Sequence, residues 1–468
     1  MKTHFKFSRI MFNFLVILFL GLFSNCQKDE DPTISTPIVP PPTHLEQYGT
    51  PFANVPQPQD AIIYQVNTRV FSTTRNFQGV IARLDNIKAL GVNVIYLMPI
   101  YPVGQEKAIN SPYCIKSYSE VGSEFGTLDD LRELVDEAHS RDMAVILDWV
   151  GNHTAYDHPW AKTNKNWYVV DGSGNFTNPN GWGDVIQLNF SNQEMRTEMI
   201  STMMDWVYTA NIDGFRCDYS DGPPANFWKQ AIDSLKTITT HKLLMLSEGT
   251  RSTNFSAGFN YNFGFGFYDQ LKKTFANNQS AKLLDNFNTS DYTGATANQY
   301  MVRYITNHDV NSSDGTPLTL FGGKQGSMAA FVVAAYMKSV PMIYNGQEVA
   351  TSYKLPFPFT GTTINWSVNP DVTSEYTKVI GFRNSSSAIK EGTNTSYSTV
   401  DVCAFTKTSG SETVLVISNL RNKTVNFTLP ASIANTTWND VFTTPETSVT
   451  LGVAINLAPY EYRVFQIK

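Results

Sequence analysis

Cysteine is scarce in this chain, which has four cysteines among its 468 residues. One of them, Cys26, falls in the N-terminal leader, so Cys114, Cys217 and Cys403 are left for the folded part. Three thiols cannot all pair with one another, and none of them has the spacing of a zinc site. The sequence therefore predicts no disulfide framework and no thiolate metal centre.

An excess of charge of either sign is also missing. The chain has 35 Lys and Arg residues against 41 Asp and Glu residues, which gives a net charge of −6. Because a nucleic-acid-binding surface needs a basic face, we expect no nucleic-acid partner. No Gly-rich phosphate-binding loop follows the first predicted strand, and we expect no organic cofactor. Aromatic residues are plentiful, which suits carbohydrate binding but is explained equally well by core packing.

The first residues have the pattern of an export signal. Basic residues precede an apolar run at 10–23, which is too short for a comfortable transmembrane helix. The run ends at Cys26, which resembles the lipidated cysteine of bacterial lipoproteins, and the acidic segment at 28–31 resembles the one that follows it in surface-exposed lipoproteins. We therefore predict a lipoprotein signal peptide at 1–26. A plain secretory signal with an incidental cysteine is the alternative.

Residues 27–58 are rich in Pro and Thr, and we predict that they form a disordered tether. With a lipid on Cys26, the protein would be exported and anchored to the outer membrane, at the cell surface or on the periplasmic face.

From residue 60 onward, apolar runs typical of strands alternate with runs that have helical spacing, such as 77–90, 128–140, 225–235 and 325–337. Such alternation predicts a parallel sheet, and eight strands are the number that closes a (β/α)8 TIM barrel. An open doubly wound sheet is the alternative. The predicted strands lie at 61–66, 92–98, 143–149, 212–218, 243–248, 259–262, 302–306 and 341–344.

The domain boundaries follow from changes in this pattern. We assign the barrel to 59–388, and within it the long connection at 153–188 to a small excursion domain on the catalytic face, because long loops inside a domain are usually functional. After residue 388 the apolar residues alternate with period two, which predicts a C-terminal all-β sandwich domain at 389–468.

The stretch at 213–218, Asp-Gly-Phe-Arg-Cys-Asp, is an unusual end for a buried strand. Arg216 and Asp218 lie two apart, so both side chains point to the same side of a strand. An Asp beside an Arg is expected to stay ionised, as a nucleophile must be. Taken alone, the pair could equally be a structural salt bridge at the end of a strand.

Polar residues also follow other predicted strands, and in a barrel all of these would meet at one rim. They are Asp148, Asn152 and His153 after the third strand, Arg216 and Asp218 after the fourth, Glu248 after the fifth, and Asn307, His308 and Asp309 after the seventh. Glycoside hydrolysis needs such a set, because it takes one ionised carboxylate and one carboxylic acid on either side of the sugar bond. A third carboxylate can favour the positively charged transition state.

These clusters match, in identity and order, the four signature motifs of the α-amylase superfamily, glycoside hydrolase family 13, which the chain resembles over about 60–390. Further matches lie at 91–100, 124–127 and 346–348. The resemblance implies that Asp218 is the nucleophile, Glu248 the general acid/base and Asp309 the transition-state stabiliser.

The same resemblance implies roles for the surrounding residues. Arg216 would orient the nucleophile, His153 and His308 would bind the sugar at the cleavage site, and Tyr113 would stack on it. Family calcium sites use the Asn of the third-strand motif together with carboxylates of the excursion domain, which points to Asn152 and Asp184 and makes Ca²⁺ a candidate cofactor.

The function implied is that of a retaining α-amylase-type hydrolase that cleaves α-1,4 bonds of starch or maltooligosaccharides. The alternative is a cyclomaltodextrinase- or neopullulanase-like activity, or a glucanotransferase, at the same site. A starch-binding protein with a decayed site is a third possibility, and the intact carboxylates argue against it.

The chain departs from the family at Asp221 and Gly222, where many members have a Lys-His pair on the leaving-group side. An association with a surface glycan-uptake system is a further expectation.

Overall fold

The computed structural model describes residues 37–43, 46–443 and 446–467. The predicted signal peptide with Cys26, and the first part of the predicted tether, lie outside this range.

Eight parallel strands close into a barrel with the order β1-β10-β9-β8-β7-β6-β3-β2, as the sequence predicted. All eight strands are buried apart from the first residue of β9, which explains their continuous apolar runs. Their bounds are β1 (Ile63–Val66), β2 (Val94–Leu97), β3 (Ala144–Trp149), β6 (Gly214–Cys217), β7 (Leu244–Ser247), β8 (Tyr261–Phe263), β9 (Tyr300–Arg303) and β10 (Val340–Tyr344).

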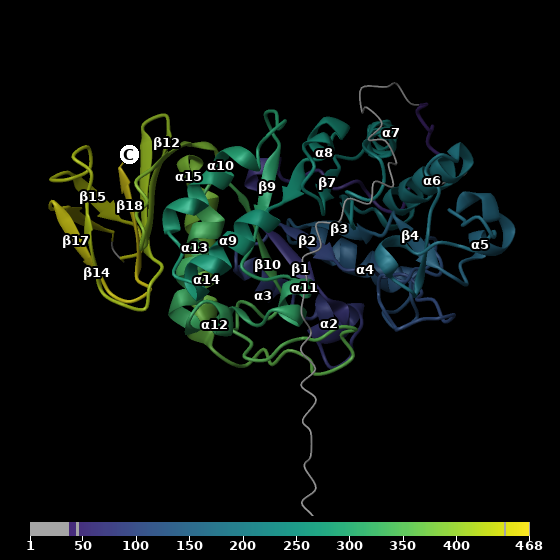
Figure 1. Ribbon diagram of the computed structural model, residues 1–468, viewed down its shortest axis with the longest axis horizontal. Coiled ribbons are helices and arrows are strands. Elements are labelled where there is room, and N and C mark those ends of the chain that lie inside the picture. The colour runs from purple at the N-terminus through teal and green to yellow at the C-terminus, as the bar shows by residue number, and fades with distance from the viewer. Residues whose placement is uncertain (1–36, 44–45, 444–445, 468) are drawn as a thin grey trace, which may run out of the picture.

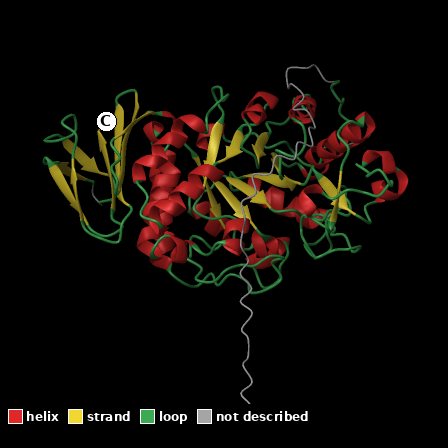
Figure 2. Cartoon of the chain, in the orientation of Figure 1, coloured by secondary structure: helices red, strands yellow, loops and turns green. Residues whose placement is uncertain are grey.

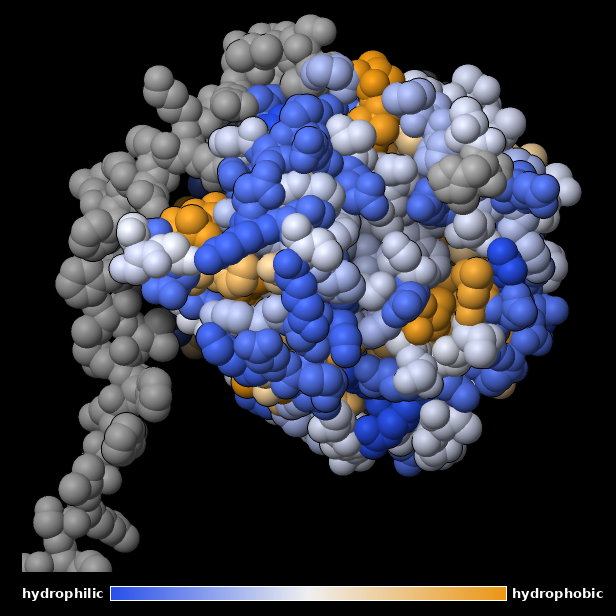
Figure 3. All heavy atoms as spheres, turned by 90° about the vertical axis from the view of Figure 1, so that its right-hand side faces the viewer, coloured by the Kyte–Doolittle hydropathy of each residue, from blue (hydrophilic) through white to orange (hydrophobic). Residues whose placement is uncertain are grey.

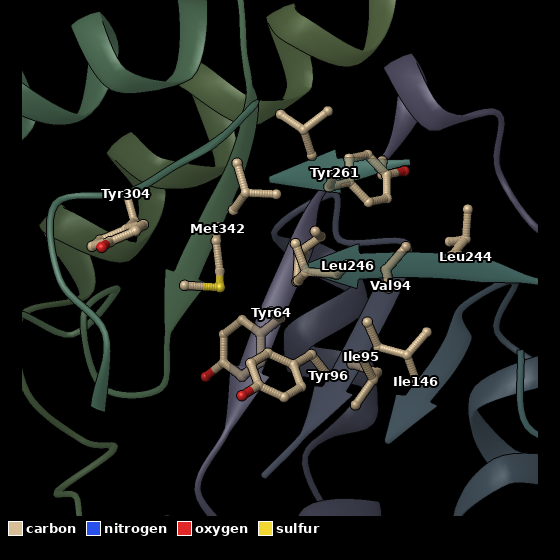
Figure 4. Close-up of a cluster of buried hydrophobic side chains, with 14 of the residues drawn as sticks. Tyr64, Val94, Ile95, Tyr96, Ile146, Leu244, Leu246, Tyr261, Tyr304 and Met342 are labelled. Atoms are coloured by element: carbon tan, nitrogen blue, oxygen red, sulfur yellow. The ribbon is translucent and has the colours of Figure 1, made fainter. Parts of the chain in front are cut away.

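Side chains from neighbouring strands pack against one another in the barrel region. Figure 4 shows Tyr64 of β1, Tyr96 of β2, Leu246 of β7 and Met342 of β10 among the buried side chains of this region. These four residues belong to the largest apolar cluster of the molecule. A packed barrel gives the strand ends fixed positions, and the site is built on those ends.

Helices surround the barrel (Figure 1; Figure 2). The run predicted as one helix at 77–90 is in fact two short helices, because Arg83 leaves helical geometry with φ −121° and ψ 5°. No helix among the described residues is long and apolar enough to cross a membrane. The helices are α1 (Thr68–Phe71), α2 (Phe77–Ile81), α3 (Leu84–Ala89), α4 (Leu128–His139), α6 (Gln193–Ala210), α7 (Ala225–Leu235), α8 (Ser252–Ala257), α9 (Phe265–Ala276), α10 (Phe287–Ser290), α11 (His308–Ser313), α12 (Pro317–Leu320), α13 (Gly323–Tyr336), α14 (Pro370–Ser385) and α15 (Ser387–Glu391).

The long connection between β3 and α6 folds into a small unit of its own. Its strands β4 (His153–Ala155) and β5 (Val185–Gln187) pair antiparallel, and α5 (Pro159–Thr163) lies between them in sequence. This unit lies at one end of the molecule, opposite the C-terminal strands (Figure 1). Seen from this end, the surface is mostly hydrophilic and has a few separate hydrophobic patches (Figure 3).

The C-terminal part is all-β, as predicted. One sheet has six strands in the order β11-β12-β13-β18-β15-β16, and β14 and β17 form a second, two-stranded sheet. A separate apolar cluster with members from both sheets forms the core of this part. The bounds are β11 (Thr393–Ser396), β12 (Val402–Ser409), β13 (Glu412–Asn419), β14 (Val425–Thr428), β15 (Thr437–Asp440), β16 (Thr447–Thr450), β17 (Ala454–Leu457) and β18 (Tyr462–Ile467).

The later part of the predicted tether is attached to the barrel, which corrects the expectation that 27–58 is disordered throughout. Val39 is buried, and its N–H donates to Ser234 Oγ on α7 at 2.9 Å. Tyr48 donates its hydroxyl to Asp136 on α4 at 2.7 Å. These contacts, rather than helix or strand formation, fix the segment, which is why its Pro-rich composition gave no sign of order.

Candidate active site

A cleft of about 450 Å³ lies at the C-terminal ends of the barrel strands. Asp218 follows β6, Glu248 follows β7, and Asp309 lies in α11 after β9, so the barrel brings the three predicted carboxylates to one rim. The cleft is lined by Ile109, Ser111, Tyr113, His153, Trp182, Asp184, Val185, Asp218, Tyr219, Glu248, Phe265, His308, Asp309 and Phe357.

Arg216 is the charged centre of the site, and its side chain is buried. Its Nη1 lies 2.6 Å from Asp148 Oδ1 and 2.9 Å from Asp218 Oδ1. Its Nη2 makes an ion pair with Glu248 Oε1. One guanidinium therefore joins carboxyl groups from three adjacent strands and holds Asp218 and Glu248 next to each other.

The charge of this cluster is unbalanced, because three carboxyl groups share one cation. Burial raises the pKa of Asp218 well above its ordinary value, Arg216 opposes the rise, and the neighbouring carboxyls add to it. Burial likewise raises the pKa of Asp148 to about 6. The pKa of Asp218 is therefore set by opposing effects, since burial and the neighbouring carboxyls disfavour its ionised form and Arg216 favours it. The ionisation of Asp218 in the working enzyme stays a prediction.

The backbone after Asp218 is shaped to reach Glu248. Tyr219 has a left-handed backbone with φ 39°, which non-glycine residues rarely adopt. In this conformation its N–H donates to Glu248 Oε2 at 2.9 Å. Both oxygens of Glu248 thus have donors, one from Arg216 and one from this peptide group. Strained backbone at such a position is typical of functional sites.

Asp221, which stands where many family members have a Lys, turns away from the cleft toward the loop that follows Glu248. It accepts hydrogen bonds from the N–H of Thr250 and from Nδ2 of Asn254, each at 2.9 Å. A Cβ on Gly249 would lie 2.3 Å from Asp221 Oδ1, so the loop packs tightly on this carboxylate. The residue therefore ties the loop of the fourth barrel strand to the loop of the fifth.

A second group of side chains lies beside Arg216, whose guanidinium carbon is 5.8 Å from the ring centroid of Tyr113. Tyr113 and His308 stack with ring centroids 5.4 Å apart, and the Tyr113 hydroxyl lies 2.7 Å from His308 Nε2. Burial lowers the pKa of His308 to about 3 and that of His153 to about 4, so both rings are neutral near pH 7. Neutral imidazoles in a cleft can exchange hydrogen bonds with sugar hydroxyls.

Asp309 projects into the cleft, and its side chain is 61% exposed. Its Oδ1 lies 3.2 Å from His308 Nε2. The protein around the cleft raises the pKa of Asp309, and Arg216 opposes the rise. An exposed carboxylate close to the Arg216 cluster is suited to contact a substrate rather than to support the fold.

The residues predicted to hold calcium do not form a ready site. The side-chain oxygen of Asn152 already accepts a hydrogen bond from Gln187 Nε2 at 3.2 Å. Asp184 lies at the wall of the cleft. Within the part of the chain that the structure describes, no group of three or more His, Cys, Asp or Glu residues is placed to hold a metal ion. Calcium binding stays a prediction.

Several residues of the cleft were not predicted from the sequence. Ile109, Trp182 and Phe357 are 57%, 40% and 42% exposed, and all three line the cleft. The signal for Trp182 was its position between two glycines in the excursion domain, where little structure can bury a large ring. No role was predicted for Tyr219, which directly follows the predicted nucleophile Asp218.

A closed β/α barrel that presents paired carboxyl groups, a third carboxylate and neutral histidines at its C-terminal rim defines a glycoside hydrolase. Comparison with known proteins agrees. The "Alpha amylase, catalytic domain" family matches residues 65–187, and the "Alpha-amylase SusG C-terminal domain" family matches 402–464. The chain belongs to the α-amylase superfamily, glycoside hydrolase family 13.

The relatives are distant in sequence. Alpha-amylase 2 of Dictyoglomus thermophilum is 26% identical over 399 residues, which covers 78% of this chain and 67% of that protein. The alpha-glucosidase of Pediococcus pentosaceus is 32% identical over 198 residues, 34% of this chain and 35% of that protein. The crystal structure of an alpha-amylase from Lactobacillus plantarum has a TM-score of 0.79 at 24% identity, with 88% of this chain and 100% of that chain covered. At this identity the structural likeness shows the fold.

Proposed function

We propose that the protein is a retaining α-glucan hydrolase that cleaves α-1,4-glucosidic bonds of starch or maltooligosaccharides through a covalent glycosyl-enzyme. The observation that carries this proposal is the single guanidinium of Arg216 between Asp218 and Glu248. Carboxyl groups that share one guanidinium lie close together, and a short separation between the two carboxyl groups is the arrangement of retaining enzymes.

Each carboxyl group then has one task. Asp218 attacks the anomeric carbon while Glu248 gives its proton to the departing sugar oxygen. The same Glu248 afterwards takes a proton from water, which attacks the glycosyl-enzyme and releases the product with its original configuration. Asp309, exposed in the cleft, stabilises the positive charge that develops on the sugar in both steps.

The alternative is transfer to another sugar or cleavage of cyclic and α-1,6-linked glucans, since the same carboxyl groups serve these reactions. Proteins with oligo-1,6-glucosidase activity in their names are 29–30% identical over 197 residues. A cyclic α-maltosyl-(1→6)-maltose hydrolase of Arthrobacter globiformis has the same fold, with a TM-score of 0.74.

Product analysis on amylose, pullulan and a cyclodextrin tests the proposal. We expect linear maltooligosaccharides from amylose as the main products, with slower or no reaction on the other two substrates. Asp218→Asn is the control, because it removes the nucleophile and should abolish turnover of all three. Products longer than the substrate would favour a transferase, and preferred cleavage of pullulan or cyclodextrin would favour the alternative activity.

We also propose that Cys26 is lipidated and that the enzyme is anchored to the outer membrane, where it could act beside a glycan-uptake system. The support is the apolar run that ends at this cysteine. Stable anchoring needs more than one acyl chain, as bacterial lipoproteins have. The full-length protein should therefore fractionate with membranes, and Cys26→Ala should release it. Recovery of the unmutated protein in the soluble fraction would contradict the anchor.

A further inference from the structure

The leaving-group side of the cleft has no charged side chain from the segment after the nucleophile. Asp221 is held by Thr250 and Asn254, and it faces the loop rather than the cleft. A Cβ on Gly222 would lie 2.5 Å from Asn152 Oδ1, so this position has no room for a larger side chain. Whatever binds the departing sugar must therefore come from elsewhere.

An aromatic pair stands next to this gap. The rings of Trp182 and Tyr219 lie edge to face, with centroids 5.3 Å apart and planes at 72°. Trp182 is 40% exposed, and both residues line the cleft. A Cβ on Gly181 or on Gly183 would meet no atom within 4 Å, so the segment on either side of the tryptophan is open to solvent.

The position of Tyr219 tells which side of the scissile bond this pair serves. The residue follows Asp218 directly, and its N–H is bonded to Glu248, the proposed proton donor. A proton donor lies beside the oxygen of the departing sugar. Tyr113 and His308 stack on each other, and the ring centroid of Tyr113 lies 5.8 Å from the guanidinium carbon of Arg216. The aromatic pair therefore adjoins the proton donor through Tyr219, on the side of the departing sugar, and Trp182 also packs edge to face on His153, with ring centroids 5.6 Å apart.

We propose that Trp182 and Tyr219 form the binding site for the glucosyl unit on the leaving-group side. The inference rests on the proposed hydrolase function. An exposed indole can pack its ring against the C–H face of a pyranose, and the edge-to-face contact with Tyr219 fixes the position of the indole. The same site would receive an acceptor sugar in the reverse direction, so it also sets how well a sugar competes with water for the glycosyl-enzyme.

Two substrates separate this role from a general role in catalysis. In maltotriose the leaving group is a sugar, whereas in α-glucosyl fluoride the leaving group is a fluoride ion. We expect Trp182→Ala to lower kcat/KM for maltotriose by roughly tenfold to a hundredfold, the usual effect of truncating an aromatic anchor. The value for α-glucosyl fluoride should stay within about twofold. Trp182→Phe should recover much of the loss, and Tyr219→Leu should lose less than Trp182→Ala.

The control is Val170→Ala, because Val170 lies in the same excursion domain, is 42% exposed and is not part of the cleft. It should leave both substrates unaffected. Transfer gives a second measurement: with α-glucosyl fluoride as donor and glucose as acceptor, Trp182→Ala should reduce the disaccharide yield relative to hydrolysis.

Three outcomes would overturn the assignment. An equal fall on both substrates would place the pair on the side of the attacked sugar. Unchanged maltotriose turnover in Trp182→Ala would show that the ring binds no sugar there. If the unmutated protein turned over neither α-glucosyl fluoride nor maltotriose, the proposed function itself would be refuted. This outcome is distinct from the first two, which concern the Trp182 variant.

Discussion

Exchanging each carboxyl group of the central pair for an amide should have opposite effects on stability. Asp218 accepts one hydrogen bond, from Arg216 Nη1, and an asparagine can keep it with its single oxygen. Glu248 accepts from Arg216 with one oxygen and from the N–H of Tyr219 with the other. A glutamine has only one acceptor, so its NH₂ group must face one of these two donors.

The magnitudes follow from this difference. A buried donor without a partner costs about 1–3 kcal/mol, so we expect Glu248→Gln to lower the free energy of unfolding by that amount at pH 7. Burial raises the pKa of Asp218, which means that the folded state favours the protonated carboxyl. The contribution of Asp218 to the free energy of unfolding is therefore fully present below the ordinary carboxyl pKa and is lost as pH rises through the folded-state pKa. Asp218→Asn should therefore be neutral at pH 4 and stabilising by about 1 kcal/mol at pH 7. Urea unfolding at both pH values measures this.

Activity with azide separates the chemical roles of the same two variants. α-Glucosyl fluoride needs little protonation, so Glu248→Gln should still form the glycosyl-enzyme, and azide should release it as the α-glycosyl azide. In Asp218→Asn, azide can only attack the substrate directly, from the opposite face, and any product should be the β-glycosyl azide. NMR of the anomeric proton distinguishes the two products. An exchange of these outcomes between the variants would show that nucleophile and acid/base are assigned the wrong way round.

Three further predictions concern residues outside the central pair. Asp221→Ala should lower kcat/KM for maltotriose by about tenfold or more and affect α-glucosyl fluoride less, because it loosens the Glu248 loop; equal losses would refute this. Burial lowers the pKa of Lys407 to about 7, so Lys407→Met should stabilise the protein by about 2–4 kcal/mol at pH 7 and by little at pH 10.5, as thermal unfolding at both pH values would show. Gly214→Ala should not yield folded protein, because its Cβ would lie 2.0 Å from the Leu244 carbonyl oxygen; soluble, active protein would contradict the close approach of β6 and β7.

The barrel was predictable because its strands are short apolar runs with helices between them, and the rim residues because polar side chains directly follow such runs. The weaker strands of the C-terminal part, β11 and β15 to β17, were not predicted, since they are mostly exposed or half-buried and have few apolar residues. The break between α2 and α3 was also missed. Arg83 ends the run there, and its guanidinium lies 4.2 Å from the ring centroid of Trp366, a contact that only the folded chain brings together.

For a similar reason, the sequence could not predict which atoms of the site face each other. The identities of Asp218, Glu248 and Asp309 follow from local patterns, but the raised pKa of Asp218 depends on how deeply the strand ends are buried. The orientation of Asp221, which faces away from the cleft, depends on the loop after β7, whose residues lie about 30 positions further along the chain. Its charge gave no sign that it braces this loop, because the same carboxylate could have faced the cleft.

Asp148 shows why a fourth carboxyl group belongs to this site although it does not reach the cleft. Its side chain is fully enclosed and accepts hydrogen bonds from the hydroxyls of Tyr96 at 2.7 Å and Tyr113 at 3.2 Å. Because it also pairs with Arg216 Nη1, it helps to fix the guanidinium, whose Nη1 reaches Asp218 as well and whose Nη2 pairs with Glu248. A guanidinium held in this way cannot follow either carboxylate when charge moves between them. It therefore offers the same positive field to the nucleophile before attack and to the acid after it has given up its proton, which is what two consecutive steps at one anomeric carbon require.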